Sequence, residues 1–290
     1  MSQYLNHHLL INYFCHKPSN LKIALVDYES YEYYSQFRHL YNKLIISKSQ
    51  QIPSGHMSEP PSLFPVIVRP KINLDGMGKE ARLVSNLSEF KQIKSTHLFW
   101  VTKLKGNHYS VDIFINSYGI LGTICFQGYP GSNFTFKYWE YKSTYRLPKS
   151  ITMWIQKYLN NFKGVFNLEI IGDKIIECHL RMGDIIFFQS PQLMQKVIDC
   201  HLNKRIYLDA LPKLFLIPIF VSKNKFYHLK KTDIWKAVNE SNSRSSLKHY
   251  KIDSPSKLSN PPGGNRICIC SFDSLSKGMS FKNRIYQNLN

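Results

Sequence analysis

The sequence predicts an α+β fold of two packed lobes followed by a C-terminal extension. The expected elements run in the order strand, glycine loop, strand, helix, three strands, helix and hairpin. A doubly wound parallel sheet needs strands and helices that alternate regularly, so this order argues against one. Apolar residues make up 43% of the 290 residues and charged residues 20%, which is typical of a folded chain with a normal core.

The first sixty residues are expected to form a strand, a helix and a linker. The segment LKIALVDY (21–28) has the composition of a strand. Large side chains then recur at three- and four-residue intervals, at Tyr34, Phe37, Leu40, Tyr41 and Leu44. This spacing predicts a helix from about Ser30 to Lys48 with one buried face. The Pro, Ser and Gly content of QIPSGHMSEPPS (51–62) indicates a linker.

Residues 64–128 are expected to be rich in strands. FPVIVRPK is a strand that Pro70 should end, and INLDGMGKEARLV is a glycine loop leading into a second strand. NLSEFKQI is a short helix with Asn86 or Ser88 as its cap. HLFWVTKL, HYSVDIFIN and ILGTICFQG are strands, the last two joined at 117–119.

The second half of the chain alternates predicted helices and strands. PKSITMWIQKYLNNF and PQLMQKVIDCHLN are amphipathic helices, and VFNLEII and KIIECHLRM form a hairpin around Gly172 and Asp173. LFLIPIFV and RICICSF are two further strands. The polar stretch 241–265 between them reads as a loop.

The net charge of +19 calls for an anionic partner such as phosphates, an acidic protein or nucleic acid. Basic residues are spread along the whole chain, so a solvated basic surface and a weak electrostatic nucleic-acid interaction are both consistent with it. The best stretch for nucleic-acid binding is FTFKYWEYKSTYR (134–146), in which aromatic and basic residues alternate. A pair of aromatic strands in the core explains the same stretch.

The six cysteines suit a reducing compartment, and we expect a cytoplasmic protein without a membrane segment. The longest apolar runs, KLFLIPIFV and DIIFFQ, are too short to span a bilayer. The segment MSQYLNHHLLINYF has no basic region before its apolar residues, so no secretion signal is expected. Cys268 and Cys270 share one face of a strand, where we expect two buried thiols rather than a metal site.

The most specific signal for chemistry is the hairpin. Asn167 and Glu169 share one face of its first strand, and Glu177, His179 and Arg181 share one face of the second.

A three-residue turn centred on Asp173 would place Glu169 directly opposite Glu177. Like charges opposite each other on a sheet are destabilising, and a cation between them would remove that cost. Magnesium takes oxygen ligands from one or two carboxylates and from substrate phosphates, and Arg181 could grip a phosphate. A surface hairpin with an incidental Glu-His-Arg ladder is the alternative.

This hairpin resembles that of the ATP-grasp superfamily, which carries a G-x-x-N-x-E strand followed by an E-x-N-x-R strand. The resemblance implies that Asn167, Glu169 and Glu177 hold magnesium and that Arg181 contacts phosphate. His179 stands where an asparagine is expected. Imidazole is a poorer magnesium ligand than an amide oxygen, so this departure favours manganese or weakens one metal position.

The segment PVIVRP around Arg69 resembles the P-V-V-V-K-P strand of the ATP-grasp lid, whose lysine reaches the nucleotide phosphates. Arginine keeps the charge but changes the geometry. The glycine loop that follows, Asp75-Gly76-Met77-Gly78, resembles the lid hairpin tip, where backbone amides approach phosphate oxygens. A plain β-turn is the alternative.

The segment from Trp100 to Asp112 resembles the hinge between the two ATP-grasp lobes. The resemblance implies that adenine bonds the backbone of Thr102, Lys103 and Leu104. His108 replaces the glutamate that commonly holds the ribose, and Asp112 matches.

The resemblance covers Phe64 to Asp184, about 120 residues. It divides the chain into a reduced N-terminal region (1–60), a lid lobe (61–106), a metal and phosphate lobe (107–205) and a partly loop-rich extension (206–290).

The resemblance implies a ligase that uses ATP with Mg²⁺ or Mn²⁺ to join a small carboxylate to an amine through an acylphosphate. Arg69 and Arg181 would be its catalytic phosphate contacts. The substitutions at Arg69, His108 and His179 leave a second interpretation open, a catalytically retired scaffold that binds nucleotide, protein or nucleic acid.

Overall fold

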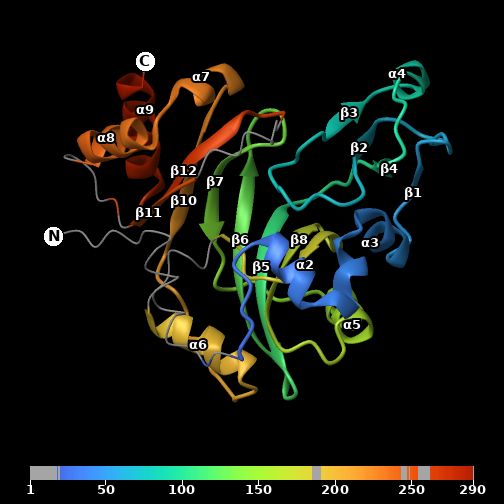
Figure 1. Ribbon diagram of the computed structural model, residues 1–290, viewed down its shortest axis with the longest axis horizontal. Coiled ribbons are helices and arrows are strands. Elements are labelled where there is room, and N and C mark those ends of the chain that lie inside the picture. The colour runs from blue at the N-terminus through green and yellow to red at the C-terminus, as the bar shows by residue number, and fades with distance from the viewer. Residues whose placement is uncertain are drawn as a thin grey trace.

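The computed structural model describes residues 18, 20–184, 191–242, 247, 249–253 and 262–289. Two antiparallel sheets organise these residues (Figure 1). The smaller has the strand order β1-β4-β2-β3 and the larger the order β11-β12-β10-β7-β6-β5-β8-β9. The predicted α+β class is confirmed.

The smaller sheet contains β1 (Ser54–His56), β2 (Val66–Pro70), β3 (Arg82–Val84) and β4 (Leu98–Thr102). Its apolar face packs on Phe90 of the short helix α4 (Leu87–Lys91). The predicted cap is correct, because the Asn86 side chain accepts a hydrogen bond from the Glu89 amide at 3.0 Å. The predicted linker is wrong in part, since its residues 54–56 form β1 and pair with β4.

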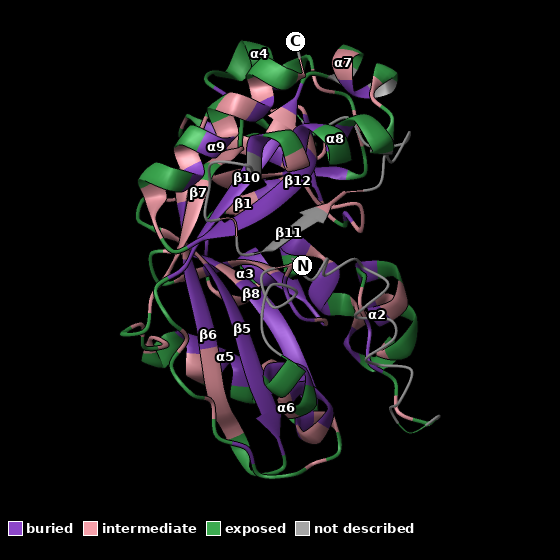
Figure 2. Cartoon of the chain, turned by 90° about the vertical axis from the view of Figure 1, so that its left-hand side faces the viewer, coloured by how far each residue is buried: buried purple, intermediate pink, exposed green. Residues whose placement is uncertain are grey.

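The larger sheet holds the two longest strands, which pair with each other; β5 is buried along most of its length and β6 in part (Figure 2). Its strands are β5 (His108–Asn116), β6 (Gly119–Pro130), β7 (Phe136–Tyr141), β8 (Gly164–Ile171), β9 (Lys174–His179), β10 (Phe215–Val221), β11 (His249–Ile252) and β12 (Asn265–Phe272).

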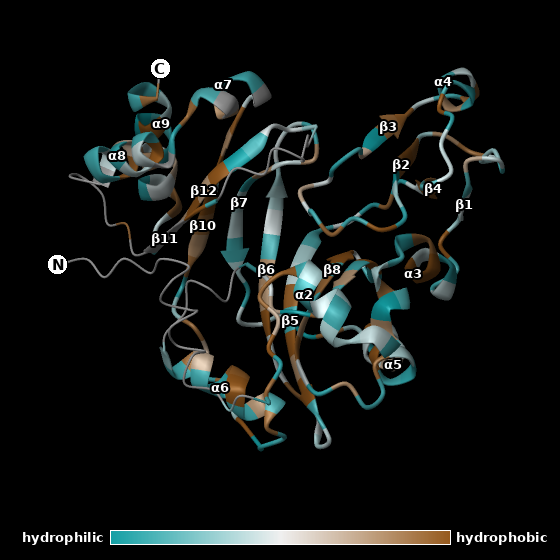
Figure 3. Cartoon of the chain, in the orientation of Figure 1, coloured by the Kyte–Doolittle hydropathy of each residue, from teal (hydrophilic) through white to brown (hydrophobic). Residues whose placement is uncertain are grey.

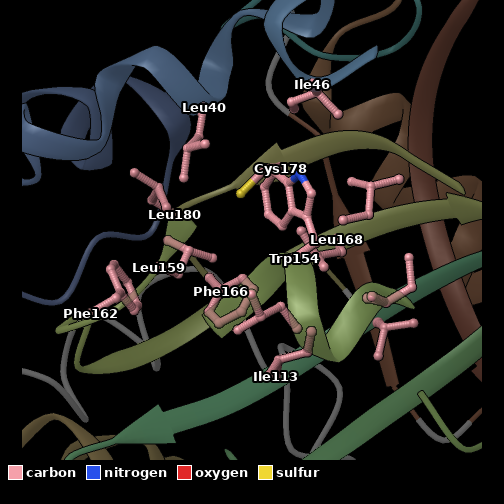
Figure 4. Close-up of a cluster of buried hydrophobic side chains, with 14 of the residues drawn as sticks. Leu40, Ile46, Ile113, Trp154, Leu159, Phe162, Phe166, Leu168, Cys178 and Leu180 are labelled. Carbon is pink, nitrogen blue, oxygen red and sulfur yellow. The ribbon is translucent and has the colours of Figure 1, made fainter. Parts of the chain in front are cut away.

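Helices cover both faces of this sheet because its central strands carry apolar side chains on both faces. On one face α5 (Lys149–Tyr158) packs through Trp154 against Phe166 and Leu168 of β8 (Figure 4). On the other face α6 (Pro191–His201) packs through Val197 against Phe114 of β5.

The N-terminal prediction is wrong in two respects. The expected strand at 21–28 has no strand assignment, and its last residues begin helix α2 (Asp27–Tyr33). The single helix expected over 30–48 is three segments: the end of α2, the 3-10 helix η1 (Ser35–Tyr41) and α3 (Lys43–Ser49). Non-helical backbone at Tyr34 and Asn42 causes the breaks, and the Asn42 side chain caps α3.

These breaks let the N-terminal segments follow the edge strand β9. Leu40 of η1 and Ile46 of α3 lie against Cys178 and Leu180 of the hairpin (Figure 4). The large side chains that suggested one helix therefore do form one buried face, but they reach it from separate segments.

The hairpin has the predicted pairing, with Glu169 opposite Glu177. The turn is different. Two residues, Gly172 and Asp173, connect the strands, and a β-bulge at Ile176 restores the even spacing. Gly172 has a φ of 62°, a conformation that favours glycine.

The C-terminal residues contribute three strands to the larger sheet. The predicted strands β10 and β12 pair with each other, β10 joins β7, and both are strongly apolar (Figure 3). Three helices that the sequence analysis did not anticipate accompany them, α7 (Lys223–His228), α8 (Lys231–Asn242) and α9 (Leu275–Asn288). Part of the expected loop is the strand β11, while 243–246, 248 and 254–261 lie outside the described residues.

The described cysteines are buried free thiols, and Cys268 and Cys270 are both fully buried, as predicted. Cys15, the N-terminal segment considered for a signal, and residues 185–190 of the DIIFFQ run lie outside the described residues. Among the helices of the described residues, none has the length and hydrophobicity needed to cross a bilayer.

We expect Gln50→Ala to lower the free energy of unfolding by about 1–3 kcal/mol, because it leaves a backbone amide of the hairpin unsatisfied. The Gln50 side chain accepts a hydrogen bond from the Ile175 amide and donates one to the Ile175 carbonyl, each 2.8 Å long. Urea unfolding measures the effect. The exposed Gln92→Ala is the control and should change stability by less than about 0.5 kcal/mol. Equal stability of both variants would show that this contact does not hold the hairpin.

Candidate functional site

A cavity of about 890 Å³ lies between the smaller sheet and one face of the larger sheet. Every site residue predicted from the sequence lines it. These residues are Arg69, Asp75, Gly76, Met77, Gly78, Thr102, Lys103, Leu104, His108, Asn167, Glu169, Glu177, His179 and Arg181. The fold thus brings three separate sequence signals to one place.

Glu177 is held by two cations. Its carboxylate lies 2.9 Å from Lys43 Nζ and 3.2 Å from an Arg69 guanidinium nitrogen. Burial alone would raise the pKa of Glu177, but the charges of Lys43 and Arg69 lower it well below its usual range. Glu177, which lies opposite Glu169 as predicted, therefore already has compensating charges from the protein.

Arg69 also joins the two sheets. It extends from β2 and donates a hydrogen bond of 2.6 Å to the Ile176 carbonyl at the bulge of the hairpin. Lys43, at the start of α3, is 5% exposed, and burial lowers its pKa while the Glu177 charge partly offsets this. The sequence analysis missed Lys43 because nothing in the local pattern distinguishes it from a surface lysine at a helix start.

His179 and Arg181 share a second buried anion, Asp27. His179 Nδ1 lies 3.0 Å from one Asp27 oxygen, and Arg181 donates to the other at 2.7 Å. Burial opposes the charge on His179, but Asp27 outweighs it and raises the pKa of His179 to about 10. Its Nε2 lies 3.4 Å from Glu177, so carboxylates face both ring nitrogens of His179 in this arrangement.

Asn167 belongs to a buried polar network. Its amide nitrogen donates to Ser110 Oγ at 3.0 Å and to Asp112 Oδ1 at 3.1 Å, and the Gly183 amide donates to the same Asp112 oxygen at 2.6 Å. Burial raises the pKa of Asp112 to about 6, although these hydrogen bonds oppose the rise. Asp112 thus acts within the structure as the acceptor that orients Asn167.

Glu169 differs from Glu177 in its partner. Its carboxylate lies 3.0 Å from His108 Nε2, and the charge of this imidazole depends on its protonation. Glu169 is therefore the predicted metal ligand whose charge is least neutralised by the protein. Within the described residues, no group of three or more His, Cys, Asp and Glu side chains is arranged to hold a metal.

The glycine loop is more than a plain β-turn. Gly76, Met77 and Gly78 have φ values of 71°, 59° and 64°, and such a run of left-handed residues is strained at Met77. The Asn73 side chain fixes the loop, because it donates to the Gly76 carbonyl and accepts from the Asp75 amide. Backbone strain of this kind clusters at ligand sites.

Two buried donors in the cavity wall lack a partner. In the described part of the protein, neither Arg69 Nε nor Arg181 Nε makes a hydrogen bond, although both atoms are buried. A buried donor without a partner is costly. Independently of these two atoms, the guanidinium groups of Arg69 and Arg181 bring positive charge to the cavity wall, which favours an anionic ligand.

The stretch 134–146 considered for nucleic-acid binding contains one strand of the larger sheet. Its central part is β7, which lies between β6 and β10, and Phe136 and Trp139 line the cavity. The strand is half-buried along most of its length, so this stretch belongs to the sheet and the cavity wall rather than to a fully buried core.

No protein-family model and no curated protein sequence matches the chain. Solved structures do. The carboxyaminoimidazole ribonucleotide synthase of Aspergillus clavatus complexed with ATP is 13% identical, with 91% of this chain and 78% of that chain covered and a TM-score of 0.59. The corresponding Staphylococcus aureus synthetase complexed with ADP is also 13% identical, with 89% and 73% covered and a TM-score of 0.61.

The L-amino acid ligase of Bacillus licheniformis is 12% identical, with 88% of this chain and 71% of that chain covered and a TM-score of 0.56. At such low identity the likeness concerns the fold. It agrees with the motifs of the hairpin, lid and hinge, and the chain has the fold of the ATP-grasp superfamily.

Proposed function

We propose that this protein is an ATP-dependent ligase that joins a carboxylate to an amine through an acylphosphate. The observation that carries the proposal is the cavity, because the hairpin, lid and hinge residues predicted independently all line it. The fold neighbours are ligases or synthetases, and some of them were solved with ATP or ADP.

The nucleotide fits this cavity in two parts. Apolar side chains from both sheets, Ile67 and Val101 on one side and Ile171 and Ile176 on the other, line the part nearest the hinge and suit the adenine. The phosphates would lie toward Arg69 and Arg181, whose buried Nε donors lack partners in the described protein.

The fit is weaker for a divalent ion. Glu177 is paired with Lys43 and Arg69, and His179 lies between Asp27 and Glu177, so Glu169 is the predicted carboxylate ligand whose partner is a histidine and not a lysine or arginine. We propose that Mg²⁺ or Mn²⁺ arrives with the nucleotide and that Glu169 is its principal protein ligand, with Glu177 and Asn167 as further candidates. Such an ion neutralises phosphate charge.

The protein's contribution to the reaction is to position the groups and to compensate charge. The substrate carboxylate attacks the γ-phosphate, and ADP leaves. The amine then attacks the acylphosphate carbon, phosphate leaves, and the amine loses a proton as the amide forms. Arg69 and Arg181 would stabilise the charge on the transferring phosphoryl group, and the glycine loop would exclude water.

The direct test is a screen of paired small carboxylates and amines with ATP and Mg²⁺ or Mn²⁺, with ADP formation and amide formation both measured. Product that requires all three components supports the ligase. Nucleotide binding without turnover across a broad screen would favour the retired scaffold.

One observation favours that second candidate. Two groups of charged side chains in the cavity wall are each internally paired without a metal ion. One is Glu177 with Lys43 and Arg69, and the other is Asp27 with His179 and Arg181. A retired enzyme that keeps its nucleotide would have this arrangement. The basic charge would then support only weak, salt-sensitive contacts with nucleic acid.

We expect Arg69→Ala to weaken ATP binding by roughly 10- to 100-fold, since a hydrogen bond to a charged group contributes about 1.5–3 kcal/mol. Isothermal titration calorimetry measures the affinity. Arg69→Lys, which restores the residue of the resembling motif, should recover part of it. The control is Arg82→Ala, an exposed residue of the neighbouring strand β3, which should bind ATP as the unmodified protein does. Equal loss in both alanine variants would point to general electrostatics.

A matched pair of variants separates the two glutamates. Glu177→Gln should destabilise the protein by a few kcal/mol because Lys43 loses a buried partner, whereas Glu169→Gln should leave stability within about 1 kcal/mol. Glu169→Gln should instead weaken the dependence of nucleotide binding on the divalent ion. Melting temperature and metal-dependent binding are measured on both. The reverse assignment of effects would exclude Glu169 as the main ligand.

A further inference from the structure

The cavity extends well beyond the residues expected to hold ATP. Its lining continues from His108 across the sheet to the C-terminal strands, with Pro218 and Phe220 of β10 and Arg266 and Ile269 of β12. These residues belong to the part of the chain that the sequence analysis treated as an extension of unknown role. The cavity therefore has one half next to the smaller sheet, which holds the predicted nucleotide residues, and a second, more apolar half on β7, β10 and β12, in which Arg266 is paired with Asp184 and Asp253.

Aromatic rings build the apolar half. Phe136 and Trp139 of β7 have ring centroids 4.1 Å apart, and both are only partly buried, although their strand lies inside the sheet. Gly128 of the neighbouring strand makes room for them, because a Cβ atom there would lie 2.6 Å from the Phe136 ring and 2.8 Å from the Trp139 ring.

His108 connects the two halves. Its ring meets the Phe136 and Trp139 rings edge to face, with centroids 4.9 Å and 5.6 Å away, while its Nε2 lies 3.0 Å from Glu169. A ring bound against Phe136 and Trp139 would thus lie next to His108, which contacts Glu169, the proposed ligand of the divalent ion.

Phe134 completes this wall from the loop between β6 and β7. It has a φ of 62°, follows Asn133 with a φ of 48°, and is 44% exposed while lining the cavity. A bulky residue in this conformation is unusual and marks a strained position. Gly263 allows the chain to pack closely against this loop, because a Cβ atom there would clash with Thr135 Cγ2.

The same loop reaches the lid. A Cβ atom on Gly78 would lie 3.7 Å from Phe134 Cβ, so the glycine loop and Phe134 are neighbours at the cavity. Phe134 therefore lies where the half of the cavity next to the smaller sheet meets the half formed by aromatic rings.

We propose that the aromatic half, formed by Phe134, Phe136, Trp139 and Phe220, binds a planar aromatic or heteroaromatic ring of the second substrate. The inference rests on the proposed ligase function and gives the substrate a chemical class. Flat rings contact aromatic walls over a large area and gain further from offset or edge-to-face geometry, which a saturated ring of the same size lacks. The C-terminal strands thereby supply the wall of the substrate site.

The test uses ligand-observed NMR on the full chain with a library of matched pairs. Each pair is an aromatic carboxylate or amine and its saturated counterpart, such as benzoate and cyclohexanecarboxylate or benzylamine and cyclohexylmethylamine. The aromatic member should bind about three- to tenfold more tightly.

Two variants and a control test whether the tighter binding of aromatic ligands depends on the aromatic half of the cavity. Trp139→Ala should lower the affinity for aromatic members about tenfold, and Phe134→Ala, which alters only an exposed loop residue, should lower it severalfold. Tyr118→Ala removes an exposed aromatic ring that does not line the cavity and should change nothing. ATP affinity, measured on the same samples, should stay within twofold in all three.

Each outcome decides between the proposals. Equal binding of aromatic and saturated members, no binding of any aromatic member, or aromatic binding unchanged in both Trp139→Ala and Phe134→Ala overturns the aromatic subsite. If ATP binding is intact in those samples, the proposed nucleotide site stands. Aromatic binding that is selective in a protein that does not bind ATP would instead remove the proposed ligase function.

Discussion

The contact between Arg69 and the hairpin is the interaction on which the candidate site depends. Arg69 belongs to the smaller sheet, and it reaches Glu177 and the Ile176 carbonyl of the larger one. Lys43 reaches the same carboxylate from the N-terminal segment. One largely enclosed glutamate, with 14% of its side chain exposed, therefore brings three parts of the chain together around the cavity. Removing one partner from such a group leaves a buried charge uncompensated.

The charge balance of the cavity follows from this arrangement. Although the chain carries a net charge of +19, the cavity wall holds several carboxylates, each near a cation or a histidine. The buried Nε atoms of Arg69 and Arg181 are the exception, because they are donors that lack partners in the described protein. Because the charges of the wall are largely paired with each other, the cavity favours a ligand that brings most of its own countercharge, as a nucleotide with a divalent ion does.

Much of the site could be predicted because its signals are local. Strand alternation and an assumed three-residue turn predicted Glu169 opposite Glu177, and the structure reaches the same pairing through a two-residue turn and a β-bulge at Ile176. The lid strand and the Asn86 cap were likewise readable from short segments. These features depend on the two-residue repeat of a strand or on a single capping side chain, and both can be recognised within a few neighbouring residues.

The rest depends on contacts between distant segments. Asp27 and Lys43 become site residues only because the N-terminal helix breaks at Tyr34 and Asn42 and follows β9. The aromatic wall requires β10 (from Phe215) to pair with β7 (to Tyr141), which lies far back in the chain, and β12 to pair with β10. No local pattern encodes such pairings. The helix α9 was not predicted either, because its sequence is largely polar and contains a glycine, which disfavours a helix.

The measurement that tests the central claim most directly is the melting temperature with ATP and Mg²⁺ or Mn²⁺. A ligand that binds only the folded protein stabilises it by RT ln(1 + [L]/Kd), roughly 2.7 kcal/mol at about a hundredfold excess over Kd. The account predicts a clear rise with ATP and the divalent ion, and a smaller rise with the ion alone. An unchanged melting temperature with every purine nucleotide at millimolar concentration would contradict it.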